Sequence, residues 1–326
     1  MSFKDVVGLD PVIRMLKGQI AGGRVGQTYL FTGPAGIGKR LLAVKFAKVL
    51  MCTEPDADGA CNGCETCLKI NEKKFPDLLE VHPESESGSF GIEQVRLLAN
   101  WISLTPYRGP WKAAIVDEAD RMTEEASHAF LKLLEEPTGR TLIILVTTTP
   151  GRLPATLLSR CHVVRCAPQG IRRTERFLTE KARLEPEVAS LLASVSGGRL
   201  GIALSYHQEN RLPEKNRVLD QLLAAWRNRE LEIPLGTFPR RQVEEALDWL
   251  AGWWRDLAVL SLGGKEEWVI HQDRLKDLKA GTKETVADLL EWAEKALAVQ
   301  DGIQKNASAK IALAGLLSAS KGSSGE

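Results

Sequence analysis

The segment from Gly33 to Arg40 constrains this chain more than any other, because its glycines and lysine suit the binding of phosphate. It follows an apolar run at 28–32, which predicts a strand, and it opens a helical segment at 41–51. Glycines allow positive φ angles, so backbone N–H groups can turn toward phosphate oxygens beside a helix N-terminus and a lysine ammonium. We therefore predict a nucleotide-binding loop made of Gly33, Pro34, Ala35, Gly36, Ile37, Gly38, Lys39 and Arg40.

Arg40 is the departure from the phosphate-loop pattern. The pattern asks for serine or threonine after the lysine, because that hydroxyl binds the magnesium of Mg-ATP. An arginine at this place either repels Mg²⁺ or turns away and leaves one coordination position to water. The sequence therefore allows ATP or ADP, with Mg²⁺, as cofactors, but it argues against efficient hydrolysis.

Composition and charge limit the class of protein. With 326 residues and 44% hydrophobic side chains, the chain can build the cores of roughly two or three domains. Its 43 basic and 42 acidic residues give a formal charge of +1, so no global field marks it for a nucleic acid or a membrane. No apolar core of signal-peptide length opens the sequence, and no run of about eighteen apolar residues occurs. We therefore expect a cytoplasmic protein with no membrane partner.

Four cysteines form the second strong pattern. Cys52, Cys61, Cys64 and Cys67 are separated by eight, two and two residues, and nearby glycines allow the sharp turns that a tetrahedral metal site needs. In a reducing compartment such cysteines are better explained as metal ligands than as disulfides. Four protein ligands leave no place for water, so we predict a structural Zn²⁺ site within residues 52–67. A reactive dithiol or unpaired buried thiols are the alternatives.

An acidic pair follows another apolar strand, at residues 111–116. Asp117 can hold Mg²⁺ or its water, and Glu118 can polarise the water that attacks the γ-phosphate. The alternative is a solvated acidic turn that caps the helix beginning near Thr123. A further strand at 141–147 ends in Thr147, whose hydroxyl could sense the γ-phosphate or could simply end the strand.

Five expected strands alternate with helices in the first half of the chain. We expect the strands at residues 28–32, 77–82, 111–116, 141–147 and 162–166. This alternation predicts a five-stranded parallel sheet with helices on both faces and ligands at the carboxyl ends of the strands. After Pro168, helical periodicity replaces the strand signals, so the fold class is α/β followed by all-α. We expect a nucleotide-binding-like domain at 1–167 with the zinc module at 52–67, a small helical lid at 168–208 and a C-terminal helical bundle at 209–326.

Taken in order, these motifs resemble the clamp-loader branch of the AAA+ proteins, and within it the subunits of the bacterial DNA polymerase III clamp loader. The most specific matches are the four-cysteine insertion, the run from Leu133 to Pro137, and the run from Leu153 to Cys161 with its Ser159-Arg160-Cys161 motif. The resemblance covers nearly the whole chain. It implies an AAA+ phosphate-loop domain and a C-terminal collar through which subunits assemble.

The resemblance also implies roles for two arginines. In that family the arginine of the Ser-Arg-Cys motif reaches into the ATP site of the adjacent subunit, so Arg160 is expected to act as an arginine finger in trans. Arg199 matches the second sensor of the family, on the helix that folds over the nucleotide. The alternatives are an exposed loop arginine at position 160 and an incidental arginine at the start of a helix at position 199.

Arg40 indicates which kind of subunit this chain is, because subunits that hydrolyse ATP are expected to keep serine or threonine there. We predict a non-motor stator subunit with little or no hydrolysis of its own. By the resemblance, it joins ATPase subunits of the gamma/tau type and the delta subunit in a hetero-pentamer. That complex places a sliding clamp on primed DNA.

Two other functions stay open. The first is an active AAA+ ATPase motor of the gamma/tau type, in which Lys39 binds the phosphates, Asp117 binds Mg²⁺ and Glu118 is the base. The second is a zinc-based DNA-binding module. Three lysines close to the cysteines suggest this module or form a solvated helix face: Lys69, Lys73 and Lys74.

Overall fold

The structure, a computed structural model, describes residues 3–83, 88–135, 139–228 and 240–304, together with the single residues 308, 312, 315 and 316. It divides into two compact units: Met1–Gly170 with Arg199–Gly201, and Ile171–Gly198 with Ile202–Glu326. The division into three domains stays a prediction. Glu136 and Pro137 of the motif that begins at Leu133 lie outside the described residues.

The first unit contains a five-stranded sheet in which all neighbouring strands are parallel. Its order is β2-β3-β4-β1-β5. The strands are Thr28–Thr32 (β1), Leu78–Val81 (β2), Trp111–Val116 (β3), Arg140–Thr147 (β4) and His162–Arg165 (β5). Because parallel strands end at the same edge, the segments that follow β1, β3 and β4 lie along one edge, where ligands of such sheets bind. The predicted parallel sheet is confirmed.

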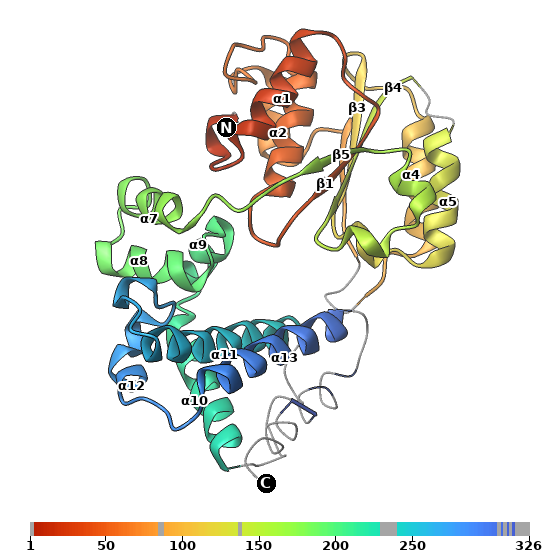
Figure 1. Ribbon diagram of the computed structural model, residues 1–326. Helices are drawn as coiled ribbons and strands as arrows, with labels where there is room; N and C mark the ends of the chain where they lie inside the picture. Colours follow the sequence, from red (N-terminus) through yellow and green to blue (C-terminus); the bar gives the residue numbers. More distant parts are fainter. Residues whose placement is uncertain are drawn as a thin grey trace. The chain divides into compact units, whose positions relative to one another are not determined.

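Helices cover both faces of this sheet (Figure 1). They are α1 (Asp10–Ala21) and α2 (Lys39–Met51) on one face, and α4 (Ile92–Ser103) and α5 (Glu124–Glu135) on the other. Successive side chains of a strand point to opposite faces, so Tyr29 and Phe31 of β1 join the core under α1 and α2, while Leu30 joins the core under α4 and α5. All of β1 is buried, which explains its continuous apolar run.

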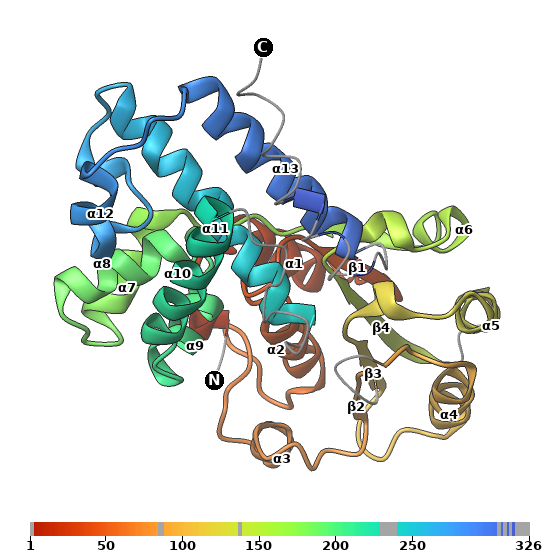
Figure 2. The ribbon, with the colours of Figure 1, turned by 90° about the horizontal axis from the view of Figure 1, so that it is seen from below.

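Short elements connect these layers. They are the 3-10 helices Phe3–Asp5, Ala119–Arg121 and Pro150–Arg152, and the α-helices α3 (Glu65–Asn71) and α6 (Ala155–Leu158). Figure 2 shows α3 in the connection between α2 and β2, which carries the four cysteines. Of the three lysines for which a solvated helix face was one expectation, Lys69 lies in α3, and Lys73 and Lys74 follow it.

The second unit is helical in its described residues, which confirms the all-α part of the predicted fold class. Its helices are α7 (Ile171–Glu180), α8 (Pro186–Val195), α9 (Leu200–Gln208), α10 (Leu212–Asn228), α11 (Arg240–Ser261), α12 (Leu275–Lys279) and α13 (Val286–Gln304), with 3-10 turns at Glu266–Trp268 and Gln272–Arg274. Helices α11 and α13 lie side by side (Figure 1). Three tryptophans, Trp226, Trp254 and Trp292, join α10, α11 and α13 through ring contacts of 5.1–6.0 Å between centroids. Among the described residues, no helix combines the length and apolarity needed to cross a membrane.

Candidate nucleotide site and metal centre

The phosphate loop joins β1 to α2 and depends on glycine. Gly33, Gly36 and Gly38 have φ angles of 144°, 75° and 92°, a region that side chains disfavour. At Gly33 a Cβ atom would also lie 2.1 Å from the backbone oxygen of Cys166, so only glycine fits there. The Gly36 oxygen accepts a hydrogen bond of 2.7 Å from the N–H of Gly201, in the first turn of α9. The loop residues thus form one turn at the carboxyl edge of the sheet.

The Lys39 ammonium lies inside this loop. It is 6% exposed and donates hydrogen bonds of 2.6 Å to the Gly33 oxygen and 2.7 Å to the Pro34 oxygen. Burial lowers its pKa, and the negative charges of Asp117 and Asp120 oppose that shift. A phosphate that entered the loop would meet this ammonium, as the sequence predicts, but would have to compete with two backbone oxygens for it.

The Arg40 side chain points toward two carboxylates. Its Nε and Nη2 atoms both lie 2.8 Å from Oε2 of Glu80, and Nε lies 4.0 Å from Oδ2 of Asp117. Burial raises the pKa of the Asp117 carboxyl, while the Glu118 N–H and the Arg40 guanidinium act against this rise. The Arg40 guanidinium thus lies beside Asp117 and is bound to Glu80, an acceptor that sequence reasoning missed.

These residues do not fit a magnesium ion in the usual place beside the phosphate loop. The hydroxyl ligand is missing, and Asp117, the carboxylate expected to hold the ion, faces a guanidinium instead. A divalent cation placed there would be repelled by Arg40 at close range. The predicted magnesium role of Asp117 therefore has no support in the arrangement of its neighbours.

The other acidic residues after β3 are engaged by neighbours. Glu118 has a φ angle of 49° and pairs with Nη1 of Arg121. The Thr147 hydroxyl at the end of β4 donates a hydrogen bond to Asp120. The helix α5 is capped by Thr123, whose hydroxyl accepts the Ala126 N–H at 3.1 Å, so the acidic pair is not its cap. The roles of Glu118 as base and Thr147 as sensor stay predictions.

The two arginines of the resemblance lie in different settings. Arg160 follows α6, and its side chain is 41% exposed; it donates hydrogen bonds of 2.9 Å to Glu135 and to the Thr156 oxygen. Arg199 precedes α9 and is partly buried. Gly201 lies two residues after Arg199, and its backbone N–H donates the hydrogen bond to the Gly36 oxygen described above. Both roles stay predictions.

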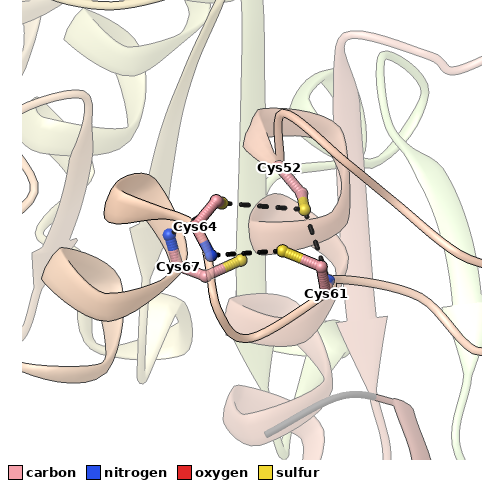
Figure 3. A group of neighbouring side chains, drawn as sticks. All are labelled: Cys52, Cys61, Cys64 and Cys67. Atoms are coloured by element: carbon pink, nitrogen blue, oxygen red, sulfur yellow. Dashed lines mark hydrogen bonds between the residues drawn. The ribbon is translucent and has the colours of Figure 1, made fainter.

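The four cysteines converge on one point in the connection between α2 and β2 (Figure 3). Their Sγ atoms all lie within 4.8 Å of one another, and the Sγ atoms of Cys52 and Cys64 are 4.0 Å apart. Tetrahedral coordination with Zn–S bonds of 2.3 Å places sulfurs roughly 3.8 Å apart, so a small contraction would seat an ion. The sequence prediction that these residues group together is confirmed, and the cluster could hold a metal such as zinc.

Backbone N–H groups donate hydrogen bonds to three of the four sulfurs and so favour their thiolate form. The N–H groups of Cys61, Cys64 and Cys67 point to the Sγ atoms of Cys52, Cys61 and Cys64 at 3.3, 3.3 and 3.5 Å. Burial raises the pKa of the Cys64 thiol, but hydrogen bonds from Thr53 and from the Cys67 N–H outweigh it and bring the pKa to about 6. Burial raises the pKa of Cys67 far above its usual value. A bound cation would favour the thiolate form at both positions.

Lys48 fastens this module to α2, a contact that no sequence pattern indicated. It is 1% exposed, and its ammonium donates hydrogen bonds of 2.7 Å to the side-chain oxygens of Asn62 and Asn71. Asn62 lies between the second and third cysteines with a φ angle of 63°, and Asn71 ends α3. One buried lysine of α2 thus binds both the loop between the second and third cysteines and the end of α3.

Replacement of Lys48 by methionine is expected to loosen the module, because two charge-assisted hydrogen bonds are lost while the length of the side chain is kept. The loss should be about 1–3 kcal/mol of unfolding free energy. It should also release zinc to a chelator faster. Thermal unfolding and chelator-competition rates measure both effects. Lys74→Met is the control, since Lys74 is exposed and pairs only locally with Glu72. Equal behaviour of the two variants would contradict the contact.

Two of the three lysines near the cysteines pair with carboxylates. Lys69 lies 2.8 Å from Glu65 and Lys74 lies 3.1 Å from Glu72. These pairs reduce the positive charge that this surface could offer to DNA, and they favour the solvated-face interpretation. The remaining cysteines lie apart from the cluster. Burial raises the pKa of Cys161 to about 12 and that of Cys166 to about 11.

Known proteins resemble this chain over much of its length. A family model described as "DNA polymerase III, delta subunit" matches residues 8–170. The chain is 31% identical over 250 residues to the DNA polymerase III subunit delta-prime of Pseudomonas aeruginosa, an alignment that covers 76% of each chain. It is 33% identical over 229 residues to subunit tau of Escherichia coli, which covers 69% of this chain but 35% of tau. A gamma subunit-related protein of Thermotoga maritima superposes with a TM-score of 0.40 at 16% identity, over 96% of this chain and 98% of that one.

Proposed function

This chain belongs to the DNA polymerase III delta-prime family of clamp-loader subunits, and from that membership we propose that it is the stator of its complex. It binds ATPase subunits of the gamma/tau type and a delta subunit in a hetero-pentamer. That complex opens a sliding clamp and places it on primed DNA. The chain itself hydrolyses little or no ATP and serves the catalysis of a neighbour.

One observation carries the non-motor part of this proposal: the Arg40 guanidinium is bound to Glu80 beside Asp117. A motor needs Mg²⁺ at this place to bridge the phosphates and to neutralise the charge that develops during transfer. A fixed organic cation does not bridge phosphate oxygens in that way. Nucleotide can still enter the loop, but its γ-phosphate lacks the metal that makes hydrolysis fast.

The exposed setting of Arg160 supports a role in trans. Two of its donors are held by Glu135 and the Thr156 oxygen, and these contacts fix the direction of the planar group at the surface of the first unit. Because guanidinium is always charged and forked, it can bind a phosphate of a nucleotide held by another subunit. Its exposed ion pair with Glu135 is weak enough to exchange for that phosphate.

Helix α13 supports assembly through the C-terminal helices. Leu290 and Leu297 are 45% and 48% exposed, and they are two helical turns apart, so they share one face. Exposed leucines on one face of a long helix favour contact with another apolar surface. We therefore assign the hetero-oligomer contacts to this part of the chain.

The cysteine module is proposed to hold structural zinc. All four ligands come from the protein, so no open position is left for catalysis. Cys52, Ala60 and Cys67 of the module, with Ile70 of α3, belong to the same core as α2. Zinc would therefore stabilise the first unit and not merely a surface loop.

The proposal is tested by separating hydrolysis in this chain from hydrolysis in its neighbours. The isolated, zinc-loaded chain is expected to show no ATP turnover. In the reconstituted complex, Glu118→Gln should leave the DNA-stimulated ATPase rate unchanged, because Glu118 has no metal-bound γ-phosphate to act on. The matching glutamate of the gamma/tau subunit, changed in the same way, is the positive control and should abolish its own turnover.

The second candidate is an active motor of the gamma/tau type, favoured by the presence of Lys39, Asp117 and Glu118 at the carboxyl edge of the sheet. Turnover by the isolated chain that is lost in Glu118→Gln would establish this candidate and reject the stator. A rate drop in the complex on Glu118→Gln alone would do the same.

A further inference from the structure

The contacts of Arg40 join three elements of the first unit. Arg40 is in the first turn of α2, Glu80 is in β2, and Asp117 follows β3 directly. The parallel register pairs Glu80 with Ile115 and Val81 with Val116. Glu80 and Asp117 therefore lie near the carboxyl ends of neighbouring strands, at the same edge of the sheet. Their separation along the chain is large, but their positions are fixed by strand pairing.

We propose that Arg40 is a built-in replacement for the divalent cation of this site, and that Glu80 is the residue that holds it there. The guanidinium supplies a fixed positive charge where an ATPase recruits Mg²⁺ from solution. The phosphate loop of this chain therefore takes no divalent cation, and any phosphate that it binds is bound independently of magnesium.

The burial of the two carboxylates supports this assignment over an ordinary surface ion pair. The side chain of Glu80 is 17% exposed and that of Asp117 is 22% exposed, whereas Arg40 is 42% exposed. Carboxylates so far removed from water need a cation nearby. Without Arg40, Glu80 and Asp117 would lose the guanidinium that both approach, and their carboxylates would offer the hard oxygen ligands that Mg²⁺ and Mn²⁺ prefer.

This inference rests on the proposed non-motor role. The Arg40 guanidinium is part of the chain, so its charge stays in place while the neighbouring subunits bind and release Mg²⁺ and nucleotide. Its test measures metal binding by the chain alone. Failure of the arginine finger, or of clamp loading, would leave that test unaffected, so the two proposals can fail separately.

Titration with Mn²⁺ alone, followed by the electron paramagnetic resonance signal of the free ion, tests the replacement. The zinc-loaded wild-type chain should bind no Mn²⁺ at this site. Arg40→Thr should bind one Mn²⁺ at least about tenfold more tightly, since two carboxylates and a hydroxyl become available. Arg40→Lys is the matched control for charge and should behave like wild type. In the double variants Arg40→Thr/Glu80→Gln and Arg40→Thr/Asp117→Asn the gained binding should be lost.

Two results would overturn the proposal. The first is a Mn²⁺ site in the wild-type chain that Asp117→Asn removes, because the position would then not be filled. The second is a folded Arg40→Thr that gains no binding. If Arg40→Thr does not fold, Arg40→Gln keeps the test, since its neutral amide can still contact Glu80 while removing the charge. Its melting temperature should rise with added Mn²⁺ and that of wild type should not; no rise counts against the proposal.

Discussion

Cys64→Ser is expected to release zinc and to lower the melting temperature of the first unit by about 10 °C. Structural zinc contributes roughly 10–16 kcal/mol of apparent binding energy in small modules, so even partial loss removes several kcal/mol. The effect should spread beyond the module, because Cys67 and Ile70 are buried in the core that α2 shares with the sheet. Calorimetry and metal analysis of the same sample measure both consequences. Chelation of the wild-type protein should reproduce them.

Cys161→Ser is the control for this experiment. Cys161 lies outside the cluster, and its thiol donates a hydrogen bond to the Leu157 oxygen, which a serine hydroxyl can also do. This variant should keep its zinc and change the melting temperature little. If both variants kept one zinc per chain and melted together, the cluster would not be a metal centre.

Arg160→Ala is expected to slow ATP hydrolysis at the neighbouring subunit by roughly 10³–10⁵, the effect of an arginine finger in comparable enzymes. The chain itself should stay folded, because the Arg160 side chain is half exposed and its ion pair with Glu135 lies at the surface. Arg160→Lys should recover little of the rate, since an ammonium keeps the charge but loses the planar fork. Single-turnover hydrolysis at that one interface of the reconstituted complex gives the measurement.

Arg96→Ala is the matched control for Arg160→Ala. Arg96 lies on α4 and, like Arg160, is exposed and pairs with a glutamate, Glu93. Both variants should assemble to complexes of the same size. An equal loss of rate in the two variants, or none in either, would rule out the trans role.

Local patterns made the first unit predictable from the sequence. The helical segment expected at 41–51 lies in α2, and the strand expected at 28–32 is β1, because helical periodicity and an apolar run are properties of neighbouring residues. The glycines of the phosphate loop were equally clear, since a positive φ angle limits the residue type. The cysteine cluster followed from ligand spacing alone.

The partners of buried charges could not be predicted in this way. Arg40 and Glu80 are forty residues apart in the chain, and Lys48 and Asn71 are separated by twenty-three. Strand pairing and the fold of the module bring these groups together, and neither leaves a periodic signal. The order of the sheet is a similar case, because β4 lies between β1 and β3 although it comes after both in the chain.

Because the thiols outside the cluster have high pKa values, alkylation of the chain's own thiols can show whether the cluster holds a metal. Cys161 and Cys166, with pKa values of about 12 and about 11, are almost entirely protonated at neutral pH and react slowly with alkylating reagents. The other four sulfurs are shielded while a metal is bound. Fast labelling at Cys64, the cluster thiol whose pKa is about 6, therefore reports the molecules that have lost their metal, without any engineered probe.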